Sequence, residues 1–360
     1  MARLCCEHSR GLAFFRKMKS YVENKDQKED FFMWNVLLLI VGFLCLIKGA
    51  DWFVDGASKL AGRFGIPQLV IGLTIVAMGT SLPEAAVSIQ GALKGTAGIA
   101  VGNVWGSNIF NVLVILGVTA LLAVLPLQRS TLFIEIPYML FVTVALLLLG
   151  VCGMSISRVD GALLWVLFLV YLGYLWWLTK GSKVSVQNRS EHNREGTEQL
   201  QNKEQHETGE EGWSVARCLL FLIIGGVLIV LGSDLTVDGA CGLAEMAGIS
   251  ERVIGLTIVA CGTSLPELVT SLVAAKKKHV DIAIGNIVGS NIFNILFVIG
   301  TASLITPIPF GQAFIADGLI ALAAGALLWL GVVRKQQLRC PCGVIMLAGY
   351  GIYLSYLLMK

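Results

Sequence analysis

Two short motifs hold the residues best suited to chemistry. They read Gly-Thr-Ser-Leu-Pro-Glu at 79–84 and again at 262–267. A proline within a helix lacks the N–H that bonds four residues back, so each motif's glycine keeps a carbonyl without a helical partner. Carbonyls of this kind, together with the carboxylates of Glu84 and Glu267, are ligands that hard cations prefer. The motifs therefore indicate a site where oxygen atoms meet a cation.

Hydroxyl and amide side chains accompany each glutamate at helical spacing. Two serines flank each glutamate on one helix face, and a serine and an asparagine four residues apart follow on the next apolar stretch. Four helix segments thus converge oxygen atoms on one point. Each serine or asparagine alone also has a structural interpretation, because polar groups commonly hold membrane helices together. These residues are Ser81, Ser88, Ser107 and Asn111 in the first half, and Ser264, Ser271, Ser290 and Asn294 in the second.

The composition places the motifs in a membrane. Of the 360 residues, 56% are hydrophobic and only 14% are charged, whereas soluble domains carry about 25% charged residues. An ordinary soluble enzyme is therefore excluded. At about 20 apolar residues per span, the apolar stretches predict ten transmembrane helices, at 33–55, 66–92, 97–125, 131–151, 159–179, 215–241, 250–275, 280–305, 312–333 and 341–359.

An ionised glutamate inside a membrane is costly unless its charge is compensated. No Lys or Arg lies in the apolar parts of the stretches that carry Glu84, Glu267 and the following asparagines, so a bound cation is the expected compensation. Carboxylates, carbonyls and hydroxyls without thiol or imidazole favour Ca2+ or Na+ and disfavour zinc or copper. A protonated glutamate, hydrogen-bonded across a helix interface, is the structural alternative for either motif taken alone.

The chain is an internal repeat. Residues 70–117 align without a gap on residues 253–300 at an offset of 183, with 29 of 48 positions identical. Each half holds five predicted helices, an odd number, so equivalent helices cross the bilayer in opposite directions. The predicted fold class is an all-α polytopic membrane protein built from two inverted five-helix repeats. The predicted domains are a polar tail (1–32), the first repeat (33–179), an acidic and polar linker (180–213) and the second repeat (214–360).

Inverted repeats whose helices are interrupted by Gly and Pro point to a secondary transporter with its site near the midplane. With the N-terminus outside, the loops that face the cytoplasm carry 15 Lys or Arg and the other loops and the C-terminus carry 4. This asymmetry predicts that both termini lie outside and that the linker 180–213 is cytoplasmic. The basic tail argues against this, a conflict that initiation at Met18 or Met33 would reduce.

Four aspartates lie near the ends of the first and sixth predicted spans. They are interpreted as solvated helix ends in preference to an ion-entry role, and Lys276, Lys277 and Lys278 as a cytoplasmic anchor. The aspartates are Asp51, Asp55, Asp234 and Asp238.

The paired motifs, GTSLPE followed by GNxxGSNIFN in both halves, resemble the alpha-repeats of the calcium/cation antiporter superfamily. The gapless layout is most similar to the prokaryotic sodium/calcium exchangers. The resemblance covers residues 33–360 and implies that the second, third, seventh and eighth helices enclose the ion sites while the first and sixth slide across them.

The resemblance also implies a ligand set. Glu84 and Glu267 would bind both Ca2+ and Na+, and the carbonyls of Thr80 and Thr263 would join them on Ca2+. The flanking Na+ subsites would be completed by Ser81, Ser264, Ser107 and Ser290 and by the carbonyls of Ala77 and Ala260.

The expected function is therefore Na+/Ca2+ antiport across the cell (inner) membrane by a multi-pass protein, for which a monomer suffices. Its partners would be the lipid bilayer and the transported ions, with no cofactor and no nucleic acid. Some members carry Asp where this chain has Asn294, and both Asn111 and Asn294 are amides here, so potassium independence is predicted. The alternatives are a Ca2+/H+ exchanger and a passive cation channel. A serine hydrolase is disfavoured because no histidine falls within a span.

Overall fold

The computed structural model describes residues 25–95, 97–192, 213–247 and 260–359. In chain order the α-helices are α3 (Lys25–Phe64), α4 (Gln68–Ile71), α5 (Ala77–Thr80), α6 (Leu82–Leu93), α7 (Gly98–Phe110), α8 (Leu116–Leu122), α9 (Ile136–Gly153), α10 (Arg158–His192), α11 (Val215–Met246), α13 (Ala260–Gly262), α14 (Leu265–Lys276), α15 (Val280–Phe293), α16 (Gly300–Ile305), α17 (Gln312–Val333) and α18 (Cys340–Met359). Short π-helical segments continue or precede some of them, namely η1 (Gly72–Val76), η2 (Asn111–Ile115), η3 (Thr131–Glu135) and η5 (Asn294–Ile299).

The predicted spans form as helices. Within the described residues, eight helical segments are long and apolar enough to cross a membrane, and the bent pair Gln68–Thr80 and Leu82–Leu93 makes a ninth. The span predicted at 250–275 begins among residues outside the described ranges. Its described part, α13 and α14, repeats the arrangement of α5 and α6. The structure is thus the predicted all-helical polytopic fold.

Two helices extend beyond the apolar stretches. Helix α3 begins at Lys25, inside the segment predicted as a polar tail, and α10 continues to His192, inside the predicted linker. Hydropathy marks only the part of a helix that lipid covers, whereas Lys, Gln and Glu, which make up four of the five residues at 25–29, are good helix formers in water. The boundaries at 32 and 180 therefore mark where a polar environment is expected to begin, and the helices cross both.

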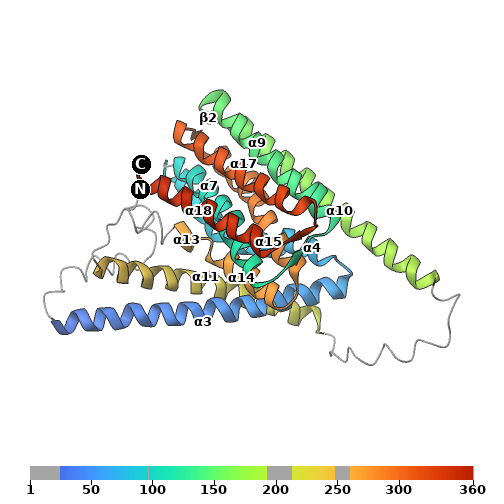
Figure 1. Ribbon diagram of the computed structural model, residues 1–360, viewed down its shortest axis with the longest axis horizontal. Coiled ribbons are helices and arrows are strands. Elements are labelled where there is room, and N and C mark those ends of the chain that lie inside the picture. Colours follow the sequence, from blue (N-terminus) through green and yellow to red (C-terminus); the bar gives the residue numbers. More distant parts are fainter. Residues whose placement is uncertain (1–24, 96, 193–212, 248–259, 360) are drawn as a thin grey trace.

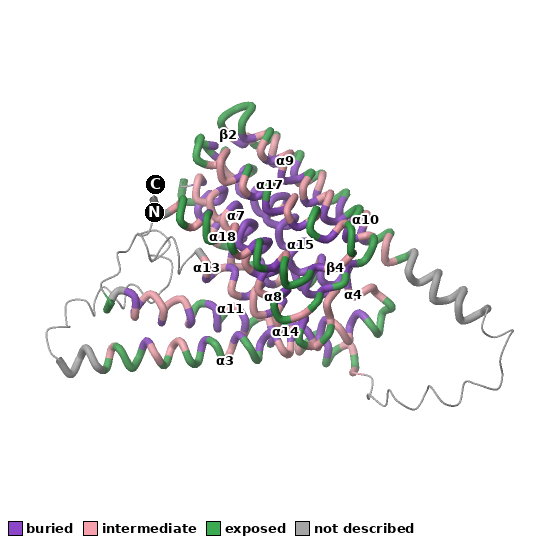
Figure 2. The backbone as a smooth tube through the Cα atoms, in the orientation of Figure 1, coloured by how far each residue is buried: buried purple, intermediate pink, exposed green. Residues whose placement is uncertain are grey.

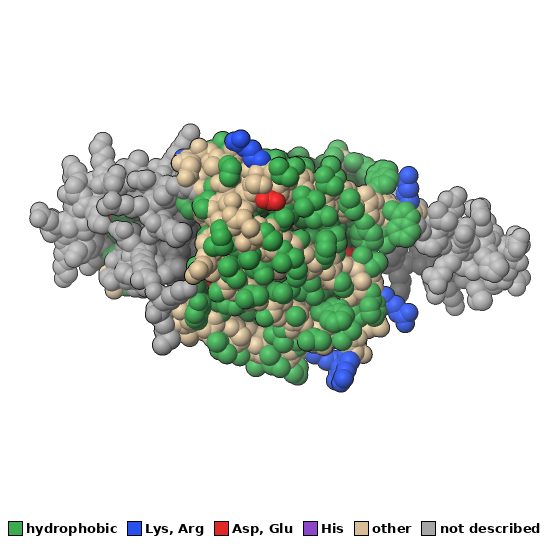
Figure 3. Space-filling model, turned by 90° about the horizontal axis from the view of Figure 1, so that it is seen from above, with side chains coloured by type: hydrophobic (Ala, Val, Ile, Leu, Met, Phe, Trp, Pro, Cys, Tyr) green, Lys and Arg blue, Asp and Glu red, His purple; other side chains and the backbone are tan. Residues whose placement is uncertain are grey.

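The central helices are those that follow the two motifs. In the apolar window of the span Val280–Ile305, 94% of the residues are buried inside the protein, and in that of Gly98–Leu122, 78% are. The remaining long spans are 17–39% buried, because they present their outer faces to lipid. Figure 2 shows α15 and α7 in the interior, and Figure 3 shows hydrophobic side chains covering most of one face, with Lys and Arg near its margins.

Two short ribbons join the repeats across the molecule. Strand β1 (Leu125–Pro126) pairs antiparallel with β4 (Gln337–Leu338), and β2 (Ser155–Ile156) pairs antiparallel with β3 (Ile308–Pro309). By the repeat, β3 is the equivalent of β1 and β4 that of β2, so the two ribbons are related by the same inverted symmetry. The sequence analysis did not predict them.

Helices α3 and α11 form a long antiparallel pair along one side of the molecule (Figure 1). Glycines seven residues apart on each helix let the backbones touch. A Cβ added at Gly49 would lie 2.9 Å from the carbonyl oxygen of Gly225, and one at Gly232 would lie 2.7 Å from that of Gly42. These two contacts are equivalents under the repeat. The pair is therefore one closely packed, internally symmetric unit.

Candidate functional site

Both motifs break a helix at the residue before the leucine. Helix α5 ends at Thr80, Ser81 adopts φ −85° and ψ 10°, and α6 begins at Leu82, with a bend of 50° across the break. Ser264 adopts φ −93° and ψ 6° between α13 and α14. Each glutamate therefore lies in the first turn of a new helix, where the helix dipole stabilises a negative charge.

The two motifs meet crosswise. The hydroxyl of Ser81 donates to Oε1 of Glu267 at 2.7 Å, and the hydroxyl of Ser264 donates to Oε1 of Glu84 at 3.2 Å. All four side chains are fully buried. Because each serine belongs to one repeat and its acceptor to the other, neither repeat contains a complete site. The structure thus brings together the four residues that the sequence singled out first.

The following helices present the two predicted asparagines from π-helical turns. Asn111 is the first residue of η2 and Asn294 the first of η5, and π-turns of this kind are common at functional sites. The Asn111 amide donates to Oδ1 of Asn291 at 3.0 Å, and the Asn294 amide donates to Oδ1 of Asn108 at 3.1 Å. The amide nitrogen of each asparagine thus donates a hydrogen bond to the other repeat, and its amide oxygen points away from that contact.

The sequence analysis missed the asparagines that orient this site. Asn108 and Asn291 fix the amides just described, and each also donates to the other's backbone carbonyl, at 3.2 and 3.3 Å. Asn103 donates to Ser88 at 3.1 Å, and its equivalent Asn286 donates to Ser271 at 2.9 Å. Their recurrence in both copies of GNxxGSN was the available signal.

Among the buried side-chain oxygens without a hydrogen-bond partner, four belong to the two motif glutamates and to the two asparagines on the following helices, and these four form two symmetric pairs. They are Oε2 of Glu84 and of Glu267 and Oδ1 of Asn111 and of Asn294. Neither glutamate forms an ion pair with any residue that the structure describes. Buried polar groups are normally satisfied, and unsatisfied ones call for an explanation such as an ion. These donor atoms fit a hard cation.

Of the remaining predicted residues, Thr80 and Ser290 each contact the other repeat. Thr80 is buried, and its hydroxyl lies 3.1 Å from the Val76 carbonyl and 3.0 Å from Oδ1 of Asn286, while Ser290 donates to the Ala77 carbonyl at 3.3 Å. Ser107 is buried and Thr263 half-buried. Ala260 begins α13, and its side chain lies outside the described set.

One expected free carbonyl has a partner. Pro266 was expected to leave the carbonyl of Gly262 free, but Ser233 of α11 donates to it at 2.8 Å. Pro266 has no N–H to bond to this carbonyl within the helix, and a hydroxyl on α11 donates to it instead. The sixth predicted span is therefore bound directly to the broken motif.

A buried, pseudo-symmetric site of oxygen atoms between two inverted repeats is typical of secondary transporters, and this protein is therefore a membrane transport protein. The family model for the sodium/calcium exchanger protein matches the chain twice, over residues 34–177 and 218–359. The chain belongs to the sodium/calcium exchanger family.

Individual relatives agree along nearly the whole length. The chain is 37% identical over 325 residues to the inner membrane protein YrbG of Escherichia coli, covering 89% of this chain and 95% of that protein. It is 32% identical over 346 residues to the sodium/calcium exchanger MaX1 of Methanosarcina acetivorans, covering 90% and 98%. Among solved structures, the sodium-calcium exchanger NCX_Mj matches with a TM-score of 0.73 and 31% identity, covering 90% of this chain and 99% of that one. The chain is a multi-pass membrane antiporter of the prokaryotic sodium/calcium exchanger type.

Proposed function

We propose that this protein exchanges Na+ for Ca2+ across the membrane through the site between the two broken motifs. The observation that carries the proposal is the set of four unpartnered oxygens, two from carboxylates and two from amides, buried in symmetric pairs. Two carboxylates match the charge of one Ca2+, and they also suit several Na+ ions in neighbouring subsites. Competition of these two occupancies for the same oxygens supplies the coupling.

The proposed ligands follow the geometry. Glu84 and Glu267 contribute the oxygens that the crosswise serines leave free, and Asn111 and Asn294 contribute their amide oxygens. The backbone carbonyls around each break complete the set, since unwound backbone at a broken helix supplies carbonyls to transported ions. These are the carbonyls of Thr80, Thr263, Ala77 and Ala260, with the hydroxyls of Ser107 and Ser290 beside them.

Alternating access would come from the α3–α11 pair. Its close glycine packing makes it one body, and it contacts both broken motifs, because a Cβ at Gly79 would meet the ring of Phe53 at 2.8 Å and Ser233 binds the Gly262 carbonyl. A shift of this pair across the site would expose the ions to one side and close the other. The protein would work as a monomer, with its termini outside and the linker 180–213 in the cytoplasm.

The test is uptake of 45Ca2+ into proteoliposomes with and without an outward Na+ gradient. Glu84→Gln and Glu267→Gln each remove one of the two charges. A unit charge pair near 4 Å is worth about 4 kcal/mol at an effective dielectric constant of about 20, so uptake at low Ca2+ should fall more than about a hundredfold.

Glu135→Gln is the matched control, because Glu135 is equally buried and likewise keeps an unpartnered Oε2, but its hydrogen-bond donor is Tyr174, at 2.6 Å, and not a residue of either motif. It should retain gradient-driven uptake. Uptake driven by a pH gradient and indifferent to Na+ would replace the proposal with Ca2+/H+ exchange. Flux without any counter-ion would indicate a channel.

A further inference from the structure

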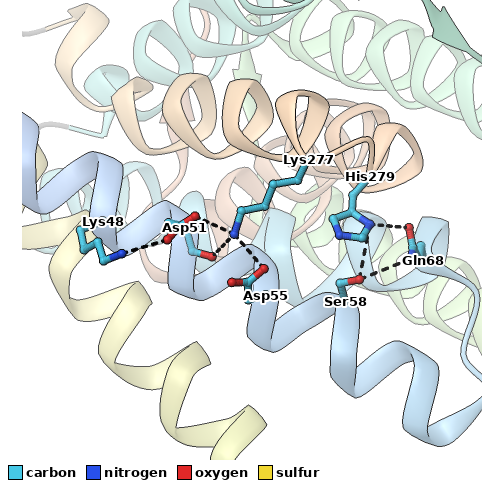
Figure 4. Close-up of polar contacts among 7 residues, drawn as sticks. All are labelled: Lys48, Asp51, Asp55, Ser58, Gln68, Lys277 and His279. Atoms are coloured by element: carbon cyan, nitrogen blue, oxygen red, sulfur yellow. Dashed lines mark hydrogen bonds and ion pairs between the residues drawn. The ribbon is translucent and has the colours of Figure 1, made fainter. Parts of the chain in front are cut away.

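The acidic side chains near the C-terminal end of α3 are paired with lysines. Nζ of Lys277, which directly follows α14, lies 2.6 Å from Oδ1 of Asp51 and 2.7 Å from Oδ1 of Asp55 (Figure 4). Lys48 lies 3.1 Å from the other carboxylate oxygen of Asp51. These two aspartates were predicted as solvated helix ends, but they lie within α3, which continues to Phe64. Their charges are neutralised by these lysines.

The other two aspartates of this kind also lie inside a helix, because α11 runs from Val215 to Met246 and contains both Asp234 and Asp238. The turn after α14 adds further contacts to α3. Nδ1 of His279 lies 3.2 Å from Oε1 of Gln68 and 3.4 Å from the hydroxyl of Ser58 (Figure 4). None of these three side chains carries a negative charge.

Three cationic side chains gather around one tryptophan where α3 ends and α11 begins. Nζ of Lys59 lies 4.1 Å from the centroid of the Trp213 ring, and the guanidinium carbon of Arg217 lies 4.4 Å from it. A guanidinium N–H of Arg63 donates to the backbone carbonyl of Trp213 at 3.0 Å. Each of these contacts is attractive, but they bring three positive charges to one residue.

The two arginines have no counter-charge in the described part of the chain. Neither Arg63 nor Arg217 forms an ion pair with a described residue, and both are exposed. Like charges held around one side chain repel each other, and more strongly in surroundings less polar than water. The planar guanidinium group matches the oxygens of carboxylates and phosphates. The cluster is therefore suited to bind an anion.

The surface beside the arginines is apolar and exposed. Leu220 and Ile224 lie on the same face of α11 as Arg217, three and seven residues further on, and are 52% and 38% exposed. Phe64, next to Arg63, is 46% exposed. Tryptophan is itself enriched where a membrane meets water. An anion bound here would thus have an apolar surface next to it, which fits an amphiphile better than a free ion.

We propose that Arg63 and Arg217, with Lys59 and Trp213 between them, bind the phosphate group of an anionic phospholipid whose acyl chains lie along the exposed face of α11. Phosphate oxygens accept strong hydrogen bonds from guanidinium groups. Since Arg63 belongs to α3 and Arg217 to α11, one bound headgroup joins the two helices. The site is separate from the buried oxygen site and does not depend on which ions are transported.

The test is lipid binding to the full chain in a neutral detergent, with bound lipid counted by native mass spectrometry. The protein is titrated with phosphatidylglycerol and, separately, with phosphatidylcholine. The wild type should bind phosphatidylglycerol more tightly. Arg63→Gln and Arg217→Gln should each weaken this binding about fivefold, as expected for one basic residue near an anionic lipid surface, and the double variant about 25-fold. Binding of phosphatidylcholine should not change.

Lys180→Gln is the matched control, because Lys180 also lies beside a tryptophan, 5.4 Å from the Trp176 ring, and the described residues place no second cation on that ring. It should leave binding of phosphatidylglycerol unchanged. The double variant Arg63→Lys with Arg217→Lys keeps both charges and should retain most of the preference. An equal loss in Lys180→Gln, or no loss when both arginines become glutamine, would overturn the proposal.

Two further arms identify the source of the anion. Inorganic phosphate at the concentration of the lipid should not displace phosphatidylglycerol, and displacement would assign the cluster to free anions. Glu210 and Glu211 precede Trp213 by three and two residues and lie outside the described ranges. Replacing both by glutamine should change lipid binding less than removal of the arginines does. A preference for phosphatidylglycerol that is absent from the wild type and appears only in this variant would assign the cluster to the linker and overturn the proposal.

A second measurement is the midpoint of thermal unfolding with each lipid. A ligand that binds only the folded state raises the midpoint, so phosphatidylglycerol should raise it in the wild type and not in the double Arg63→Gln, Arg217→Gln variant. The two proteins should have similar midpoints in phosphatidylcholine, which shows that the variant folds. An equal rise in both proteins would place the lipid elsewhere and contradict the proposal.

Discussion

The glycine contact between α3 and α11 makes a quantitative prediction for Gly232→Ala. The added Cβ would lie 2.7 Å from the carbonyl oxygen of Gly42, 2.7 Å from the backbone nitrogen of Leu46 and 3.0 Å from Cβ of Cys45. Two of these three neighbours are backbone atoms, which cannot rotate away. Overpacking of this kind costs about 1–3 kcal/mol, whereas alanine gains about 0.5–1 kcal/mol over glycine within a helix.

The expected net result is a loss of up to about 2.5 kcal/mol in the free energy of unfolding of Gly232→Ala. The control is Gly173→Ala on the exposed face of α10, where an added Cβ meets nothing within 4 Å. That variant keeps only the helical gain and should be more stable than the wild type by up to about 1 kcal/mol.

The assay is the midpoint of thermal unfolding in detergent, measured for both variants beside the wild type. Gly232→Ala should unfold at a lower temperature and Gly173→Ala at the same or a higher one. If Gly232→Ala were as stable as Gly173→Ala, the two backbones would not be in contact at this glycine, and the α3–α11 pair could not be treated as one body.

Three further predictions concern the site and its surroundings. Ser81→Ala should weaken equilibrium binding of 45Ca2+ about 10- to 100-fold, as loss of a group that orients a metal ligand commonly does. Ser264→Ala should weaken it less, because the hydrogen bond of Ser81 is 2.7 Å long and that of Ser264 is 3.2 Å. Unchanged binding in both variants would refute the role of the crosswise hydrogen bonds. Transport should be unaffected by external K+, because Asn111 and Asn294 are amides, and a strict K+ requirement would contradict this. Burial lowers the pKa of His279, so the folded state disfavours the protonated ring and loses stability as pH falls below about 6.5, its unfolded value. The thermal unfolding midpoint is therefore measured at pH 7.5 and pH 5.5, about one pH unit on either side of that value. It should fall less in His279→Gln than in the wild type. An equal fall in both would show that His279 is not the source of this pH dependence.

The repeat made the fold predictable from one sequence. The apolar stretches, their odd number in each half and the duplicated motif were sufficient for the inverted architecture and for Glu84 and Glu267 as a pair. Helical spacing also placed Ser81 on the same face as Glu84. It could not show that Ser81 bonds to Glu267, because spacing describes one helix and the partner comes from the other half.

The polar contacts outside the motifs were less accessible. Asp51 and Asp55 occupy the end of an apolar stretch, and the sequence alone does not show that α3 continues to Phe64 or that α14 ends beside it. The sequence did not single out Asn108 and Asn291. Their role in orienting Asn294 and Asn111 depends on how closely the central helices approach, which tertiary packing decides.

The crosswise hydrogen bonds have a consequence for biosynthesis. They join residues separated by 180 and 186 positions, and the ribbons β1–β4 and β2–β3 close over similar spans of chain. The complete ion site therefore cannot assemble while only the first half has entered the membrane, and at about 5–20 residues per second the ribosome takes many seconds to supply the second. During that interval Glu84 has neither the hydroxyl of Ser264 nor the facing carboxylate. The nascent first half must be inserted with this carboxylate protonated or facing water, and completion of translation is the event that creates the binding site.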